Sequence, residues 1–388
     1  MSDDLNRSLI GLALLGTSLA VVTLCLWLIG DPQSLIWTNR DFSNYWLASR
    51  MFLDGQVQDL FNGHEAYFAY MRQAFGADYP WHSWSYPPHF LFLIWPLAFL
   101  PHGISMIVFL LVTLFVYLHA VSIFARRHPQ FPVILLLPFL LCNILAAQNG
   151  FITASLFIYG LVLRDRRPVL AGVMIGMLTV KPQLGILIPI LLIYERRWLV
   201  IASAGVTTVV MILMSALIFG PDTWFGYIQN TWAYQSSVMN SATGIFLAMM
   251  PSVFGALRGL GYDATFAMTV HAPVAVVALC VFLWTLPRMR SSDSRIASLA
   301  FATFLVTPYS LTYDLGALVV FAALLHNPGR WSGARRSICL AVVMTPMLDW
   351  FVFLFAIPLM PVILAGGWGA LISQEIRAEK VVLKELPT

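Results

Sequence analysis

The stretch LIGLALLGTSLAVVTLCLWLIG, residues 9–30, contains no charged side chain and is long enough to cross a membrane as one helix. A hydrocarbon core of about 30 Å needs roughly 20 apolar residues at the rise of an α-helix. The chain of 388 residues continues in the same way, with 59% hydrophobic and 10% charged residues. Soluble proteins carry about 25% charged residues, so most of this chain is expected to lie in lipid.

The first apolar run is expected to remain as an anchor, because it lacks an A-x-A-like cleavage site and its leading segment MSDDLNR is not clearly basic. The four cysteines fall in apolar runs without CxxC spacing, so we interpret them as small core residues. The net charge of +4 does not indicate nucleic-acid binding, and no nucleic-acid partner is expected.

Lysine and arginine gather in short clusters between the apolar runs. These clusters are Arg126–Arg127, Arg164–Arg167, Arg196–Arg197, Arg288–Arg295, Arg330–Arg336 and Arg377–Lys384. The positive-inside rule assigns all of them to the cytoplasm, so consecutive clusters must be joined by an even number of crossings. Two apolar runs do separate most of them, broken at QNG (148–150), KPQ (181–183) and TPYSLTYD (307–314).

One segment does not fit this count, because the run from Pro87 to Leu100 is short and interrupted by Pro96. We interpret it as a re-entrant or interfacial segment, which is tolerated where protein surrounds it. The sequence thus predicts an all-α polytopic membrane protein with about twelve transmembrane helices and interfacial helices in its external loops. It forms one domain over residues 1–388, with a large external loop at 31–86.

In this topology the polar breaks all face the external side, which is typical of an enzyme with its site there. Asp41 begins the polar stretch RDFSNYWLASRMFLDGQ (40–56), and two interpretations stay open. Its carboxylate is suited to general-base catalysis on an acceptor hydroxyl, and Asp before an apolar-periodic segment is also a common helix N-cap. The aromatic residues of the external loop are mostly expected in the membrane-interface belt.

Lys181 is the only lysine before position 380 and lies at an external break. It is either a cation for a lipid phosphate or a side chain that snorkels to the interface. Asp314 is either a second carboxylate that orients a sugar hydroxyl or a capping residue. The further candidates for donor and substrate binding lie at the same breaks: Tyr45, Tyr86, His89, Gln148, Asn149, Gln183, Tyr309 and Tyr313. His82 and His89 lack a set of partner ligands, so no metal site is expected.

Taken in order, these motifs resemble glycosyltransferase family 87, whose members have the GT-C fold and use polyprenol-phosphate donors. The matching features are Asp41 with Tyr45 and Gly55, Tyr86-Pro87-Pro88 leading to PLAFLP, Gln148-Asn149, Lys181 to Gln183 with Arg196 to Trp198, and Thr307-Pro308. Mannosyltransferases of the family often carry a histidine after the late proline motif, where this chain has Tyr313-Asp314. The resemblance therefore does not extend to mannose as the donor sugar.

The resemblance implies an inverting transferase that moves a sugar from a polyprenyl-phosphate donor to a hydroxyl of a glycolipid or glycan acceptor, with Asp41 as the base. It would act without metal or cofactor on the external face of the bacterial cytoplasmic (inner) membrane, with membrane lipid as a further partner. The alternative is a multi-pass transporter or lipid flippase of the cell envelope. Transporters often show internal repeats and charges inside their spans, whereas the charges here lie at span ends.

Overall fold

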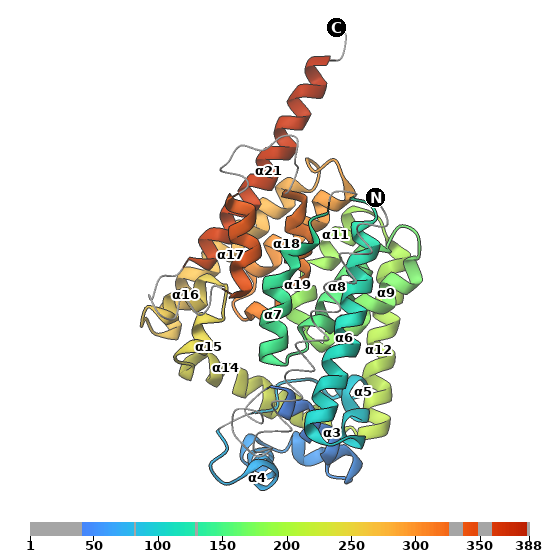
Figure 1. Cartoon of the computed structure of the whole chain (residues 1–388), viewed down its shortest axis with the longest axis vertical. Coiled ribbons are helices and arrows are strands. Elements are labelled where there is room, and N and C mark those ends of the chain that lie inside the picture. The colour runs from blue at the N-terminus through green and yellow to red at the C-terminus, as the bar shows by residue number, and fades with distance from the viewer. Residues whose placement is uncertain (1–40, 81–82, 129–130, 326–336, 348–358, 386–388) are drawn as a thin grey trace.

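The computed structural model describes residues 41–80, 83–128, 131–325, 337–347 and 359–385, and all regular structure in these ranges is helical (Figure 1). The predicted all-α class is confirmed for this part of the chain. The anchor predicted at residues 9–30 and the basic cluster at 330–336 lie outside the described residues.

Three described helices are long and apolar enough to cross a membrane: α6 (His102–Ala125), α12 (Trp198–Phe219) and α17 (Ala264–Thr285). The most apolar stretch of α12 is only 6% buried inside the protein, so its side chains need lipid around them. The corresponding stretch of α6 is 61% buried, so one side of this helix packs in the bundle while Val112 and Phe115 on the other side are exposed. The larger number of about twelve crossings remains a prediction.

Shorter apolar helices complete the bundle: η4 (Val133–Leu136), α7 (Leu137–Ala146), α8 (Gly150–Val162), α9 (Pro168–Met177), η5 (Leu178–Val180), α10 (Pro182–Gly185), α11 (Ile188–Tyr194), α18 (Ser292–Val306), α19 (Gly316–Ala322), η8 (Ala323–Leu325) and Ser337–Met347. A helix of 13 residues is about 20 Å long, less than the hydrocarbon core. These helices end at the predicted breaks because each break carries a polar or proline residue. At the first break, Ala147 turns the chain with a left-handed backbone (φ 51°).

The segment expected as an external loop is largely helical and packs on the bundle. It forms α3 (Phe42–Leu53), η1 (Val57–Leu60) and α4 (His64–Phe75) at the lower end of the molecule in Figure 1. Several of its aromatic residues form a small core instead of an interface belt, since Tyr45, Tyr67, Tyr79 and Trp84 are buried. The aromatic-belt expectation is therefore wrong for these four residues.

The run from Pro87 to Leu100 forms three short pieces, η2 (Pro88–Phe90), α5 (Leu91–Ile94) and η3 (Trp95–Phe99), in agreement with a segment that is not a continuous span. The indole Nε1 of Trp46 donates to the carbonyl of Leu100 at 2.9 Å, which ties α3 to the end of this run. The chain then enters α6 at His102 and crosses to the opposite end of the bundle.

A third group of helices lies beside the bundle: α13 (Asp222–Gly226), η6 (Tyr227–Thr231), α14 (Trp232–Ser241), α15 (Ile245–Ala248), α16 (Val253–Gly259) and the C-terminal α21 (Met360–Glu385). The short turn η7 (Thr312–Asp314) lies inside the bundle against α7 and α8. An apolar cluster joins α15 and α16 to the turn before η7 through Leu247, Phe254, Leu311 and Tyr313. This cluster supports the break at residues 307–314 from one side.

The predicted basic clusters meet at the end opposite α3. Arg164, whose side chain is fully buried, and Arg295 both pair with Glu195, at 2.6 and 2.7 Å. Arg127 pairs with Asp293 at 3.3 Å. The structure therefore brings four of the six clusters to one end of the bundle, since Arg197 also pairs with Asp165 beside Arg164.

Candidate active site

Three chain breaks that are far apart in sequence meet near α3. The carbonyl of Tyr313 lies so close to Gly150 that a Cβ there would stand 2.0 Å from its oxygen. The hydroxyl of Thr307 donates to the carbonyl of Gln183 at 3.3 Å. The breaks at QNG, KPQ and TPYSLTYD thus form one polar region inside an apolar bundle.

An ion pair holds two of these breaks together. The ammonium Nζ of Lys181 donates to Oδ1 of Asp314 at 2.6 Å, and both residues are buried, with 6% and 4% of their surface exposed. The interpretation of Lys181 as a side chain that snorkels to the interface is not supported, because its charge points inward to Asp314. A buried pair of this kind is costly to desolvate and strongly destabilising to break.

Each partner of the ion pair has a second contact. The backbone amide of Leu311 donates to Oδ2 of Asp314 at 3.2 Å, so this carboxylate also caps its own turn. The Nζ of Lys181 lies 4.8 Å from the ring centroid of Tyr313, a cation–π geometry. An ammonium carries three N–H donors, and among the described residues only one has a hydrogen-bond partner, Asp314.

A second polar network surrounds Gln148. Its side-chain oxygen Oε1 accepts from the hydroxyl of Tyr45 and from the backbone amide of Asn149, the latter at 3.1 Å. The hydroxyls of Tyr45 and Tyr86 are 2.9 Å apart. The structure therefore brings α3, the Tyr-Pro-Pro segment and the Gln-Asn turn together. Tyr45, Tyr86 and Gln148, one from each of these segments, were all candidate site residues from the sequence.

Asp41 stands at the start of α3 and its side chain makes no capping hydrogen bond. The N-cap interpretation is thus not supported by the geometry. The charge of Asp41 instead raises the pKa of the buried phenols of Tyr45 and Tyr313 and of the half-buried phenols of Tyr86 and Tyr309. Asp314 acts on the last three as well, so the two carboxylates border the same group of phenols.

These phenols stay protonated at neutral pH. Burial raises the pKa of Tyr86 well above its usual value; the hydrogen bond with Tyr45 lowers it, and the charges of Asp41 and Asp314 raise it again. Burial and then the Asp41 charge raise the pKa of Tyr313 in the same direction. Neutral phenols beside two carboxylates can donate hydrogen bonds to the oxygens of a sugar or a phosphate.

His89 and Gln183 are less involved than the sequence suggested. The imidazole of His89 is buried, contacts the Thr179 hydroxyl at 3.3 Å and stacks on Trp224 with the ring centroids 5.6 Å apart. Gln183 contributes to the site through its backbone carbonyl, which accepts the hydrogen bond from the Thr307 hydroxyl. Both residues support the site in this structure, and their direct role in binding stays a prediction.

Asn143 was not among the site residues expected from the sequence. This residue of α7 is fully buried, and within the described ranges neither of its amide atoms has a hydrogen-bond partner; the same holds for Asn149. Its Oδ1 would stand 2.4 Å from a Cβ on Gly150, so it lies directly under the Tyr313 turn. A lone asparagine in the apolar run LPFLLCNILA was the available signal, because polar residues inside membrane segments are often functional.

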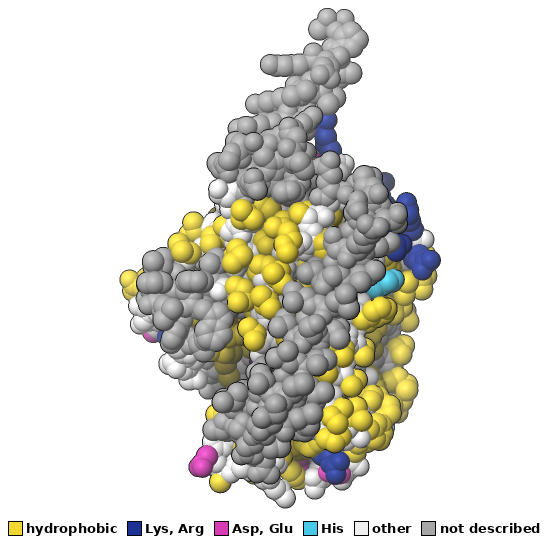
Figure 2. Space-filling view, in the orientation of Figure 1, with side chains coloured by type: hydrophobic (Ala, Val, Ile, Leu, Met, Phe, Trp, Pro, Cys, Tyr) yellow, Lys and Arg dark blue, Asp and Glu magenta, His cyan; other side chains and the backbone are white. Residues whose placement is uncertain are grey.

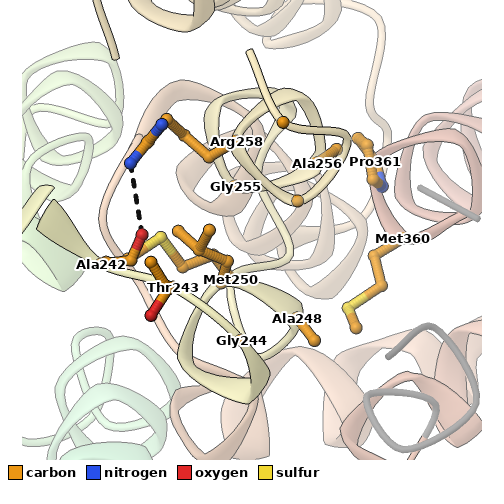
Figure 3. Close-up of a pocket in the computed structure, with 13 residues that line it drawn as sticks. Ala242, Thr243, Gly244, Ala248, Met250, Gly255, Ala256, Arg258, Met360 and Pro361 are labelled. Carbon is orange, nitrogen blue, oxygen red and sulfur yellow. Dashed lines mark hydrogen bonds between the residues drawn. The ribbon is translucent and has the colours of Figure 1, made fainter. Parts of the chain in front are cut away.

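A cavity of about 330 Å³ adjoins the site, between α16, the turn after α14 and the start of α21 (Figure 3). Figure 3 shows Arg258 reaching to the carbonyl of Ala242, a contact of 3.2 Å. The cavity shares Leu247 and Met250 with the apolar cluster that contains Tyr313. It contains none of the predicted site residues. Within the described ranges no group of three or more His, Cys, Asp or Glu residues could hold a metal ion.

Fold and site together define a polytopic helical protein with a buried polar site at one end of an apolar bundle. Residues 84–308, more than half of the chain, match the glycosyltransferase family 87 domain, and the chain belongs to this family. No curated protein and no solved structure matches this chain. The match includes Tyr86, Gln148 and Lys181, whereas Asp41 and Asp314 lie outside its bounds. Family membership identifies a transferase, and it does not favour the transporter alternative.

Proposed function

We propose that this protein transfers a sugar from a polyprenyl-phosphate donor to a hydroxyl of a glycolipid or glycan acceptor on the external face of the cytoplasmic membrane. The observation that carries this proposal is the buried pair of Lys181 and Asp314, set among neutral phenols that also border Asp41. A cation and two carboxylates at one end of an apolar bundle suit a donor whose phosphate is polar and whose chain lies in lipid.

The reaction is a single displacement at the anomeric carbon. Asp41 takes the proton of the acceptor hydroxyl, whose oxygen forms the new bond to that carbon with inversion. The bond from the anomeric carbon to the phosphate oxygen breaks, and the polyprenyl phosphate leaves with the electron pair. The lipid phosphate is already a good leaving group, so these steps need neither a metal nor a cofactor.

Lys181 stabilises the negative charge that develops on the leaving phosphate. Its two N–H donors beyond the one directed to Asp314 are suited to phosphate oxygens. Asp314 holds the ammonium in position, and the phenols of Tyr86, Tyr309 and Tyr313 lie within the electrostatic reach of both carboxylates. Gln148 and Asn149 offer amide groups to the sugar hydroxyls.

The experiment that tests the proposal is sugar transfer from a synthetic polyprenyl-phosphate donor by the protein in detergent, followed by mass spectrometry of the product. Asp41→Asn keeps the size of the side chain and removes only its charge; because Asp41 makes no capping hydrogen bond, a structural Asp41 would tolerate the change. If Asp41 is the general base, the Asp41→Asn variant is expected to transfer sugar roughly 10²–10⁴-fold more slowly than the parent protein.

The matched control is Asp54→Asn, at the other end of the same helix, where the carboxylate forms only an exposed pair with Arg50 at 3.5 Å. This variant is expected to keep normal transfer. Near-normal transfer by Asp41→Asn, with a thermal melt like that of the parent, would reject Asp41 as the base and make Asp314 the next candidate.

A further inference from the structure

A basic hollow lies at the end of the bundle opposite the candidate active site. It has a volume of about 780 Å³ and is formed where α6 and α8 end and α9 begins. Four arginines border it, Arg126, Arg127, Arg166 and Arg167, together with His119 and Tyr159. Figure 2 shows Lys and Arg side chains gathered at this upper end of the molecule, above a hydrophobic flank.

Three of these arginines carry uncompensated charge. Arg127 pairs with Asp293 and also donates to the carbonyl of Val162. In the part of the chain that the structure describes, Arg126, Arg166 and Arg167 form no ion pair and are exposed. The nearest acid in sequence, Asp165, is engaged by Arg197. The hollow is therefore a concave surface with net positive charge.

An apolar groove continues from the hollow along the same helices. It is lined by Val108, Val112 and Val116 of α6, by Ile152 and Leu156 of α8, and by Met177 of α9. Tyr159 and Met174 border both the hollow and the groove, so the two form one continuous surface. Val112 is 57% exposed, which leaves its side chain open to a hydrocarbon chain from the membrane.

The dimensions fit one lipid. From Arg126 to Val112, along α6, the helix rises about 21 Å, which is half of a bilayer of about 40–45 Å with its headgroup regions. Tyr159 lies at the junction, and its hydroxyl is 2.6 Å from Nδ1 of His119. An amphipathic ring of this kind is typical of the boundary between headgroups and acyl chains.

We propose that this surface binds one anionic glycerophospholipid, with its phosphate among Arg126, Arg166 and Arg167 and an acyl chain in the groove between α6, α8 and α9. Guanidinium groups bind phosphate oxygens through paired N–H donors, and basic pockets between membrane helices are suited to anionic headgroups. The phosphate position is separate from the donor site, because the arginines lie at the C-terminal end of α6 and neither Lys181 nor Asp314 lines the hollow or the groove.

The test is native mass spectrometry of the full chain released from nanodiscs of zwitterionic lipid that contain a small fraction of phosphatidylglycerol. The parent protein is expected to retain one phosphatidylglycerol in preference to the zwitterionic lipid. Each basic residue at a membrane surface contributes about 1 kcal/mol to anionic-lipid binding, so Arg126→Gln with Arg167→Gln is expected to weaken retention roughly 30-fold.

The matched control is Arg288→Gln with Arg290→Gln, which removes two exposed arginines outside the hollow. This variant is expected to keep the bound lipid. The parent protein is also expected to keep it when inorganic phosphate is added. Val112→Trp fills the groove and is expected to weaken retention while leaving the arginines in place.

Four results would overturn the proposal. The first is that the parent protein shows no preference for the anionic lipid, and the second is that the Arg126/Arg167 and Arg288/Arg290 variants lose the bound lipid equally. The third is that inorganic phosphate displaces the lipid fully and Val112→Trp has no effect. The fourth is that the protein retains a polyprenyl phosphate more strongly than phosphatidylglycerol. The first two would reduce the hollow to general surface charge. The third would make it a phosphate-ion site, and the last would assign it to the donor.

Discussion

Lys181 and Asp314 depend on each other at the scale of single residues. Because the two charges are buried 2.6 Å apart, removal of either one leaves the other without compensation in an apolar bundle. Lys181→Met and Asp314→Asn are each expected to destabilise the protein by about 3–5 kcal/mol. The double change is expected to restore much of this loss, since no buried charge is then left alone.

The double variant separates structure from catalysis. Thermal melts in detergent measure the stability of the four proteins in the cycle, and transfer from the polyprenyl-phosphate donor measures activity. We expect the double variant to be stable and nearly inactive, because the phosphate has lost its cation. Normal use of the lipid donor by a stable double variant would show that the pair is a structural element alone.

Glycine packing is the feature that matters most at the scale of elements. Gly172 and Gly176 of α9 face α12 at a spacing of four, the pattern that lets membrane helices approach closely. A Cβ on Gly172 would meet the Cβ of Ser203 at 2.5 Å and the carbonyl of Val200 at 2.6 Å. Since α9 leads through η5 to Lys181, this packing also positions the cation of the site.

Gly172→Leu is therefore expected to push α9 from α12, with a loss of stability of about 1–3 kcal/mol and reduced sugar transfer. Gly205→Leu on α12 is the matched control, because a Cβ there meets nothing within 4 Å. It is expected to be neutral or slightly stabilising, as leucine has a better helix propensity than glycine. Thermal melts of both variants check this, and equal effects would argue against a tight α9–α12 contact.

The ion-pair network at the arginine-rich end joins elements across the whole molecule. Burial by itself would raise the pKa of Glu195, but hydrogen bonds and charge from Arg164 and Arg295 outweigh it and lower the pKa below its ordinary value of 4.5. A lowered pKa means that the folded protein holds the carboxylate charged more readily than the unfolded chain does. Its contribution to stability is complete above the unfolded pKa and is lost as the pH falls through the folded value.

Glu195→Gln is expected to cost about 3 kcal/mol at pH 7, because it leaves the buried Arg164 with a neutral partner. The difference from the parent should shrink as the pH falls below the ordinary carboxyl range, where the parent also loses this charge. Melting temperatures from pH 7 to pH 3 measure this. Asp54→Asn, in an exposed pair, is the control and should change stability by less than about 1 kcal/mol at any pH. A constant difference between Glu195→Gln and the parent across this range would argue against the network.

Orientation in the membrane is the last prediction at the scale of the whole molecule. The concentration of basic clusters at one end predicts that this end is cytoplasmic. In a variant whose four native cysteines are replaced, an impermeant maleimide added outside intact cells should label cysteines at the exposed positions Asn62 and Asp222 and should not label one at Arg290. Labelling at Arg290 with none at Asn62 would reverse the orientation and move the active site to the cytoplasmic side.

Much of the architecture could be predicted because it rests on local properties of the chain. The length of an apolar run and the residues that break it determine where a helix can begin and end, and this holds for α6, for α12 and for the breaks at QNG and KPQ. The sequence also indicated the family and most of the polar residues that meet near α3. It indicated the wrong environment for Tyr45 and Tyr67, because composition does not distinguish a buried aromatic core from an interface belt.

The pairing of these residues was decided only by the tertiary structure. Lys181 and Asp314 are 133 residues apart, and Tyr45 and Gln148 are 103 apart, so no local pattern relates them. Lys181 had a plausible local explanation as a snorkelling residue, Asp314 as a cap, Gln148 as part of a turn and Tyr45 as part of an interface belt. Helix packing through Gly150, Gly172 and Gly176 buries Lys181, whose charge only a distant part of the chain can then satisfy, while Asp314 keeps its local cap and gains the ion pair as well.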